Sequence, residues 1–182
     1  MSAERCAFAV ETTALTKIYG DKAAVKQLDL RVREGEIYGF IGRNGAGKST
    51  TLKMLCGLAS PTEGEIRLFG KPVNDSLVRQ RLGVLIESAG AYPHLTARQN
   101  VMMKAICMGL ADDKSVDEVL GMTGLADAGR KKVKHFSMGM KQRLGVALAL
   151  LGNPDMLVLD EPVNGLDPEG IRELRQLVLR LH

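Results

Sequence analysis

The chain lacks several features that would assign it to a specialised class. It has no tryptophan, only 4% aromatic residues and three cysteines, Cys6, Cys56 and Cys107, which form no CxxC pair. Such cysteines exclude a disulfide framework and predict a reducing compartment. No run approaches the roughly 18 uninterrupted apolar residues of a membrane span, and residues 1–13 hold no long apolar signal segment. The sequence therefore predicts a protein that is neither secreted nor integral to a membrane.

What is present is the composition of one soluble globular domain. The 182 residues are 45% hydrophobic and 25% charged, which is ample for a core and far from the composition of disordered chains. A net charge of +4 is compatible with a polyanionic ligand or an anionic membrane surface, but equally with a surface bias that serves no partner. The charges are spread along the chain and aromatic residues are few, so we expect no nucleic-acid partner.

The hydrophobic pattern changes along the chain. Short apolar or alternating runs predict strands in the first part, and "GEIYGFIG" at 35–42 is the most strand-like. A helix is expected there from Gly45 to about Gly57. The later part is expected to form helices at 97–110, 114–125 and 141–153, a buried strand at 155–162, and a last helix with Asp167 as N-cap and Pro168 as its first residue.

The stretch "GRNGAGKS" matches the phosphate-binding pattern G-x-x-x-x-G-K-[ST] between the expected strand and helix. Gly42, Gly45 and Gly47 permit backbone angles that let successive N–H groups converge on phosphate oxygens. Lys48 places a positive charge on the terminal phosphates, and the Ser49 hydroxyl is suited to Mg²⁺. A chance match is expected in under about 2% of unrelated chains of this length. The motif therefore predicts nucleotide binding.

Two adjacent carboxylates, Asp160 and Glu161, end the strand expected in "MLVLDEP". Alternation along a strand predicts that they point to opposite faces and do different jobs. In phosphate-loop chemistry the first holds Mg²⁺ and the second polarises the attacking water. An acidic strand end in solvent is the alternative, which the four preceding apolar residues and the phosphate loop disfavour.

The motifs "GRNGAGKST", "FSMGMKQR", "LVLDEP" and "GLDP", in this order, resemble the ATP-binding subunit of ABC transporters over nearly the whole chain. The resemblance implies an α/β P-loop NTPase with a RecA-like core, an N-terminal antiparallel β region and an inserted helical subdomain. It implies a single ATP-binding domain over 1–182, with its core at 1–89 and 141–182 and the helical subdomain at 90–140. ATP and Mg²⁺ are the implied ligands.

The resemblance also implies the residues of the site. Those expected to bind ATP are Tyr19, Gly42, Arg43, Asn44, Gly45, Ala46, Gly47, Lys48, Ser49, Thr50, Ser137, Gly139 and Asp167. Mg²⁺ is expected at Ser49, Glu87 and Asp160, and Glu161 is the implied catalytic residue. Tyr19 is expected to stack on adenine; the alternative is an ordinary amphipathic tyrosine at a strand end.

Two positions depart from the family's pattern. Glu87 stands where the metal-contacting loop normally has glutamine, so an oxygen ligand is kept while a hydrogen-bond donor is lost. In the signature, usually LSGGQ, Ser137 and Gly139 are kept, while Met138 and Met140 replace a glycine and the glutamine. Both departures resemble the branch that exports peptide antibiotics such as bacitracin or lantibiotics.

The implied function is an ATP-hydrolysing subunit that acts as a homodimer or with a similar ATP-binding subunit. It is expected to be cytoplasmic, held at the inner face of the membrane by a transmembrane permease subunit. Tyr92 and Leu95 are expected either at the docking surface or in a local core. The family's γ-phosphate histidine lies beyond His182, so the chain is interpreted as C-terminally truncated. A nucleotide-binding remnant without turnover and a soluble ABC-type ATPase outside transport remain as alternatives.

Overall fold

The computed structural model describes residues 8–88 and 90–182. The chain divides into two compact units. The first contains the described residues up to Leu82 together with His182, and the second contains Gly83–Leu181.

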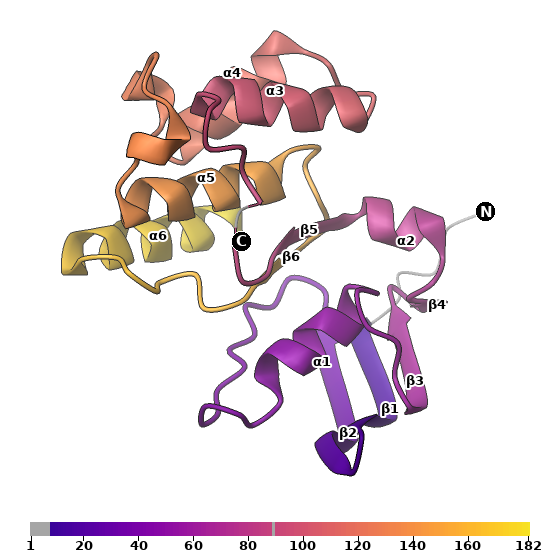
Figure 1. Cartoon of the computed structure of the whole chain (residues 1–182). Helices are drawn as coiled ribbons and strands as arrows, with labels where there is room; N and C mark the ends of the chain where they lie inside the picture. The colour runs from indigo at the N-terminus through magenta and orange to yellow at the C-terminus, as the bar shows by residue number, and fades with distance from the viewer. Residues whose placement is uncertain (1–7, 89) are drawn as a thin grey trace. The chain divides into compact units, whose positions relative to one another are not determined.

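A four-stranded antiparallel sheet forms the framework of the first unit (Figure 1). Its strands are β1 (Phe8–Tyr19), β2 (Lys22–Arg33), β3 (Glu63–Leu68) and β4 (Lys71–Pro72), in the order β2-β1-β3-β4. Leu15 of β1 and Leu68 of β3 are completely buried, so the sheet has an apolar face. The expected N-terminal antiparallel β region is confirmed.

Two helices accompany this sheet, α1 (Lys48–Leu55) and α2 (Ser76–Gln80). Helix α1 contacts β2 and buries Met54 and Thr51. The expected start of α1 at Gly45 is wrong by three residues, because Gly47 has a left-handed backbone with φ 87° and no helix can pass through it.

The strand expected at residues 35–42 is also absent from the described structure. The segment has no regular hydrogen-bonded structure, and Ile37, Tyr38 and Ile41 are all exposed. An apolar run becomes a strand only when a neighbour accepts and donates its backbone hydrogen bonds. The described strands of the sheet pair only among themselves. Residues 35–42 therefore have the hydrophobic pattern of a strand but no neighbouring strand to pair with.

The second unit is mainly helical (Figure 1). Its elements are β5 (Leu82–Leu85), α3 (Ala97–Cys107), α4 (Asp113–Met122), the short 3₁₀ turns η1 (Ala126–Ala128) and η2 (Val133–His135), α5 (Met138–Leu150), β6 (Met156–Leu159) and α6 (Pro168–Leu181). Strands β5 and β6 pair with each other. The predicted helices, the strand around 155–162 and the last helix starting at Pro168 are confirmed, although α5 begins three residues earlier than expected.

Helix α5 is the centre of this unit. Every residue from Leu144 to Leu150 is buried, so the helix is apolar all round, as expected of a helix that is surrounded by protein. In Figure 1 it lies between the α3–α4 pair and α6, and Leu174 and Leu177 of α6 join the same core cluster. The signature segment lies at the N-terminal end of α5.

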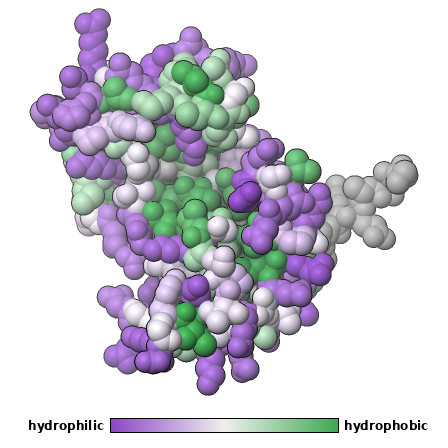
Figure 2. Space-filling view, turned by 45° about the vertical axis from the view of Figure 1, so that its right-hand side comes forward, coloured by the Kyte–Doolittle hydropathy of each residue, from purple (hydrophilic) through white to green (hydrophobic). Residues whose placement is uncertain are grey.

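The exposed surface carries both hydrophobic and hydrophilic residues. On the face in Figure 2, hydrophobic residues gather in patches among hydrophilic ones and form no continuous band. Within the described residues, no helix combines the length and the apolar character needed to cross a bilayer.

Candidate functional site

The glycine-rich loop lies in the first unit, between β2 and α1. Residues 42–46 are exposed, and Ala46 N–H donates to the Arg43 carbonyl at 3.1 Å, which closes a tight turn. Gly45 and Gly47 have φ values of 80° and 87°, which other residues rarely adopt. Arg43 and Asn44 therefore project from a loop whose shape the glycines determine.

Gly47 is the most constrained position of this loop. A Cβ atom there would lie 2.2 Å from the Ala24 carbonyl oxygen of β2, so only glycine fits. No side chain caps α1. The first backbone N–H groups of the helix, those of Lys48, Ser49 and Thr50, lie next to the loop. Uncapped N–H groups and the positive end of a helix fit an anionic phosphate chain.

The Lys48 ammonium lies over the loop. Its Nζ donates to the Gly42 carbonyl at 2.9 Å and to the Arg43 carbonyl at 3.1 Å. Thr51, one turn into α1, donates its hydroxyl to the Gly47 carbonyl at 2.9 Å and is buried. The loop carbonyls thus bind the Lys48 ammonium, and the Thr51 hydroxyl holds the last residue of the loop, Gly47.

Tyr19, the proposed adenine contact, ends β1. Its side chain is 54% exposed, and the Lys17 ammonium lies 5.0 Å from the centre of its ring. An exposed ring is accessible to a stacking partner, and a cation over the ring is a favourable contact. The ring is thus exposed at a strand end, a position that both interpretations of Tyr19 share.

The two carboxylates lie in the second unit at the end of β6. The Asp160 N–H donates to the Leu85 carbonyl of β5 at 2.8 Å, so the strand pairing continues to Asp160. At Glu161 the backbone turns into the left-handed region with φ 47°. The direction of Glu161 is therefore set by this turn, and the expected strand alternation does not apply to it.

Glu87 follows β5 by two residues. Its backbone is also left-handed, with φ 65°, and the adjacent Ser88 N–H donates to the Ile86 carbonyl at 2.8 Å. Glu87 and Asp160 thus follow the ends of the paired strands β5 and β6. Carboxylates and hydroxyls such as that of Ser49 are hard oxygen donors, the ligands that Mg²⁺ prefers.

The signature segment forms the N-terminus of α5. Ser137 is the N-cap: its Oγ accepts a hydrogen bond from the Met140 N–H at 3.2 Å. Gly139 lies in the first turn, where a Cβ atom would be 3.3 Å from Leu166. The expectation that this segment lies at a helix N-terminus is confirmed.

The "NGLD" segment leads into α6. Asp167 accepts a hydrogen bond from the Gly170 N–H through Oδ1 at 2.8 Å, so the predicted N-cap is confirmed. Asn164 donates its side-chain N–H to Glu161 Oε2, a contact that no sequence motif predicted.

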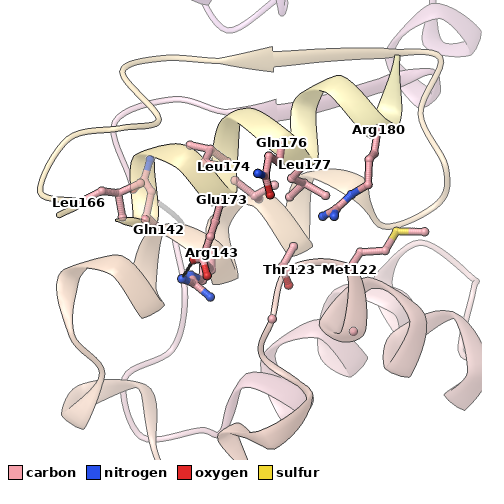
Figure 3. Close-up of a pocket in the computed structure, with 14 residues that line it drawn as sticks. Met122, Thr123, Gln142, Arg143, Leu166, Glu173, Leu174, Gln176, Leu177 and Arg180 are labelled. Atoms are coloured by element: carbon pink, nitrogen blue, oxygen red, sulfur yellow. Dashed lines mark hydrogen bonds and ion pairs between the residues drawn. The ribbon is translucent and has the colours of Figure 1, made fainter. Parts of the chain in front are cut away.

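The second unit also has a cavity of about 270 Å³ between the end of α4, α5 and α6 (Figure 3). Arg143 and Glu173 form an ion pair at its edge, and a Cβ atom at Gly124 would lie 2.8 Å from the Arg143 guanidinium. None of the residues predicted for the site lines this cavity, although Leu166, between Asn164 and Asp167, does. Since three helices build it, no local sequence pattern could have revealed it.

The predicted residues are thus divided between the two units. Tyr19 and the loop Gly42–Thr50 belong to the first, and Glu87, Ser137, Gly139, Asp160, Glu161 and Asp167 belong to the second. Among the described residues no group of three or more His, Cys, Asp or Glu side chains is placed to hold a metal ion.

Comparisons with known proteins agree with these motifs. The ABC transporter family model matches residues 25–164. The chain is 49% identical over 171 residues to a bacitracin transport ATP-binding protein, BcrA, of Bacillus licheniformis, covering 93% of this chain and 56% of the relative. It is 40% identical over 164 residues to the lantibiotic transport ATP-binding protein SrtF of Streptococcus pyogenes, covering 90% of this chain and 71% of the relative.

Two solved structures are similar over most of the chain. One is the dimeric ATP-binding cassette MJ0796 in a post-hydrolysis state with ADP and Pi, with TM-score 0.85 and 30% identity over 94% of this chain and 82% of that one. The other is cbiO1 of Clostridium perfringens, part of the ABC transporter complex cbiONQ, with TM-score 0.84 and 30% identity over 98% of this chain and 74% of that one. The P-loop NTPase fold predicted from the sequence is confirmed. The chain spans a little over half the length of the first curated relatives that it matches.

Proposed function

Since the chain belongs to the ABC transporter family, we propose that it is the ATP-binding and ATP-hydrolysing subunit of a membrane exporter. The observation that supports this most directly is the loop Gly42–Thr50, whose left-handed glycines and uncapped helix N-terminus fit a triphosphate. The relatives named for bacitracin and lantibiotic transport support peptide antibiotics or similar compounds as the exported class.

The predicted site residues of the first unit bind ATP in this proposal. Backbone N–H groups of the loop bind the β- and γ-phosphates, and the Lys48 ammonium exchanges its loop carbonyls for phosphate oxygens. Tyr19, exposed at the end of β1, stacks on adenine. Binding therefore uses the backbone for the phosphates and one side chain for the base.

The proposed chemistry uses the Ser49 hydroxyl of the first unit and three acidic residues of the second. Ser49, Asp160 and Glu87 are the proposed holders of Mg²⁺, which when bound neutralises charge on the phosphates. Glu161 is the proposed general base: its carboxylate orients a water and accepts its proton as that water attacks the γ-phosphorus and ADP leaves. The left-handed turn at Glu161 is a backbone conformation often found at functional sites.

A second subunit completes the proposal. Ser137 and Gly139 begin α5, and at a helix N-terminus they are suited to the γ-phosphate of ATP held by another copy or a similar subunit. The similarity to a cassette solved as a dimer supports this arrangement. Asp167 belongs to the adjacent segment and contributes to the same contact between subunits.

We assign the ATP-binding core to 1–89 and 141–182 and the helical subdomain to 90–140. Tyr92, 59% exposed just before α3, belongs to the surface of that subdomain that we propose docks on a permease subunit. The similarity to cbiO1, part of a transporter complex, supports a permease partner. Docking would hold the chain at the cytoplasmic face of the membrane.

Binding of a fluorescent ATP analogue by purified chain tests the phosphate loop. Lys48→Ala should abolish detectable binding, whereas Lys71→Ala, which removes one positive charge from β4 of the same unit, should leave affinity unchanged. Equal affinity of Lys48→Ala and the parent chain would refute the loop's assignment. Release of phosphate from ATP and Mg²⁺, slowed roughly 10²- to 10⁴-fold by Glu161→Gln, tests the hydrolytic role.

A further inference from the structure

Glu161 needs a partner to hold its position. It lies beyond the last residue of β6, it is exposed, and its backbone has the left-handed φ of 47°. An exposed glutamate normally samples several rotamers, and a left-handed backbone at a residue other than glycine persists only when its surroundings hold it. A general base, by contrast, must be held close to one productive geometry.

Asn164 supplies two such contacts. Its backbone N–H donates to the Glu161 carbonyl at 3.1 Å and closes the turn, and its side-chain Nδ2–H donates to Glu161 Oε2. A carboxylate only accepts hydrogen bonds, so the amide nitrogen, not the amide oxygen, must face it. The same residue therefore fixes both the backbone and the carboxylate of Glu161.

The segment that carries Asn164 is itself held on its other side. Gly165, the next residue, lies against the Met138 side chain, and the Asp167 carboxylate caps α6. Leu166 N–H donates to the Val163 carbonyl at 3.1 Å. Asn164 is thus presented by a segment anchored to both α5 and α6, which lets a single side chain hold Glu161 firmly.

We propose that Asn164 is a positioning residue for Glu161. By engaging Oε2 it orients the carboxylate so that Oε1 faces the attacking water. As a neutral amide it does so without a charge that would compete with the water's proton. This inference rests on the proposed role of Glu161 as general base.

The contact can be observed without any nucleotide. In a ¹⁵N spectrum of the purified chain, the Asn164 side-chain amide, identified by its loss in Asn164→Asp, should be displaced from the position of solvent-exposed amides. In Glu161→Ala it should return to that position. An Asn164 signal at the same place in the parent chain and in Glu161→Ala would overturn the proposal.

Turnover tests what the contact does. Asn164→Asp keeps the size and the backbone bond but replaces the donor by a carboxylate that repels the Glu161 carboxylate, so kcat should fall by roughly 10- to 100-fold. The affinity for the fluorescent ATP analogue and the melting temperature should stay close to those of the parent chain. Asn164→Gln, which keeps an amide on a longer side chain, should recover part of the loss. Asn153→Asp, the same substitution at another exposed loop asparagine of this unit, should change nothing.

A double variant separates this inference from the proposed function. In a Glu161→Gln background, Asn164→Asp should cause no further loss of turnover, because the base that it positions is already gone. Independent, multiplying losses would overturn the positioning role. So would a kcat for Asn164→Asp equal to that of the parent chain. Unchanged turnover in Glu161→Gln alone would instead refute the role of Glu161, while the spectral test would still decide whether Asn164 holds it.

Discussion

The Met138 side chain covers the α-carbon of Gly165. A Cβ atom at Gly165 would lie 2.4 Å from Met138 Cγ, and Gly165 has φ 74°. Met138 stands where the family signature usually has glycine, so this contact joins the signature segment to the segment before α6. The methionine that replaces the usual glycine of the signature thus packs against Gly165 of the same chain.

Gly165→Ala should destabilise the second unit for two separable reasons. The left-handed backbone costs about 1–2 kcal/mol for any residue with a Cβ atom, and the clash with Met138 adds to this. Urea unfolding measures the sum. Adding Met138→Ala removes most of the clashing side chain and should recover only the second part. A double variant no more stable than Gly165→Ala would show that Met138 does not press on this position.

The glycine loop offers a matched pair of substitutions. Gly45 and Gly47 have similar backbones, φ 80° and 87°, but a Cβ atom at Gly45 meets nothing within 4 Å, while one at Gly47 meets the Ala24 carbonyl at 2.2 Å. Gly45→Ala should therefore cost only the backbone strain, about 1–2 kcal/mol, and Gly47→Ala considerably more. Urea unfolding of both variants compares them directly. Equal losses would contradict the close approach of α1 to β2.

The loop before α3 is held by one buried side chain. Asn100 Oδ1 accepts from the Tyr92 N–H at 2.7 Å, and its Nδ2 donates to the Tyr92 carbonyl at 3.2 Å and the Thr96 carbonyl at 2.9 Å. Asn100 is only 4% exposed, and Asn100→Ala removes both hydrogen bonds that hold the Tyr92 backbone, so it should cost about 1–3 kcal/mol.

Hydrogen exchange locates this effect. In Asn100→Ala the Tyr92 amide should exchange faster, since it loses its acceptor. Gln99→Ala is the control: it removes the reciprocal bond to the Thr96 N–H at the same helix end but leaves Tyr92 bonded to Asn100. Similar exchange of Tyr92 in the parent chain and Asn100→Ala would show that the loop is held by something else.

Features encoded locally were predictable from the sequence. The start of α6 at Pro168 and the N-cap at Asp167 depend on neighbouring residues, and the structure agrees with both. The glycines of the loop at 42–47 predicted unusual backbone angles, which Gly45 and Gly47 adopt. The strand expected at 35–42 failed because strand formation depends on a partner elsewhere in the chain.

The contact between Asn164 and Glu161 could not be predicted from the sequence, for another reason. The two residues are only three apart, but they meet because Glu161 leaves the strand in a left-handed turn, an unfavourable conformation for glutamate. Propensity predicts the common conformation, and this residue adopts the uncommon one. The direction of the candidate base therefore had to come from the structure.

Cys56 and Cys107 should differ sharply in reactivity. Cys56 is buried at the end of α1, and this burial raises its pKa to about 12, whereas Cys107 is exposed at the end of α3. At pH 8 only about 10⁻⁴ of Cys56 would be thiolate, the form that reacts with iodoacetamide. In a Cys6→Ser, Cys107→Ser variant, alkylation should be slow in buffer and rapid in urea. Rapid alkylation of the folded variant would show that Cys56 is accessible.

The same thiol should make stability depend on pH. The pKa of Cys56 is about 12 in the folded chain against an ordinary value of 9.0, so the unfolded chain loses the proton first as pH rises. The stabilisation by the neutral thiol is complete below about pH 9 and is lost as pH rises from there toward 12. Urea unfolding at several pH values from 8 to 11 should thus show a steeper loss of stability in the parent chain than in Cys56→Ala. Because other titrating groups are common to both chains, parallel curves would mean that Cys56 ionises equally easily in the folded and unfolded states.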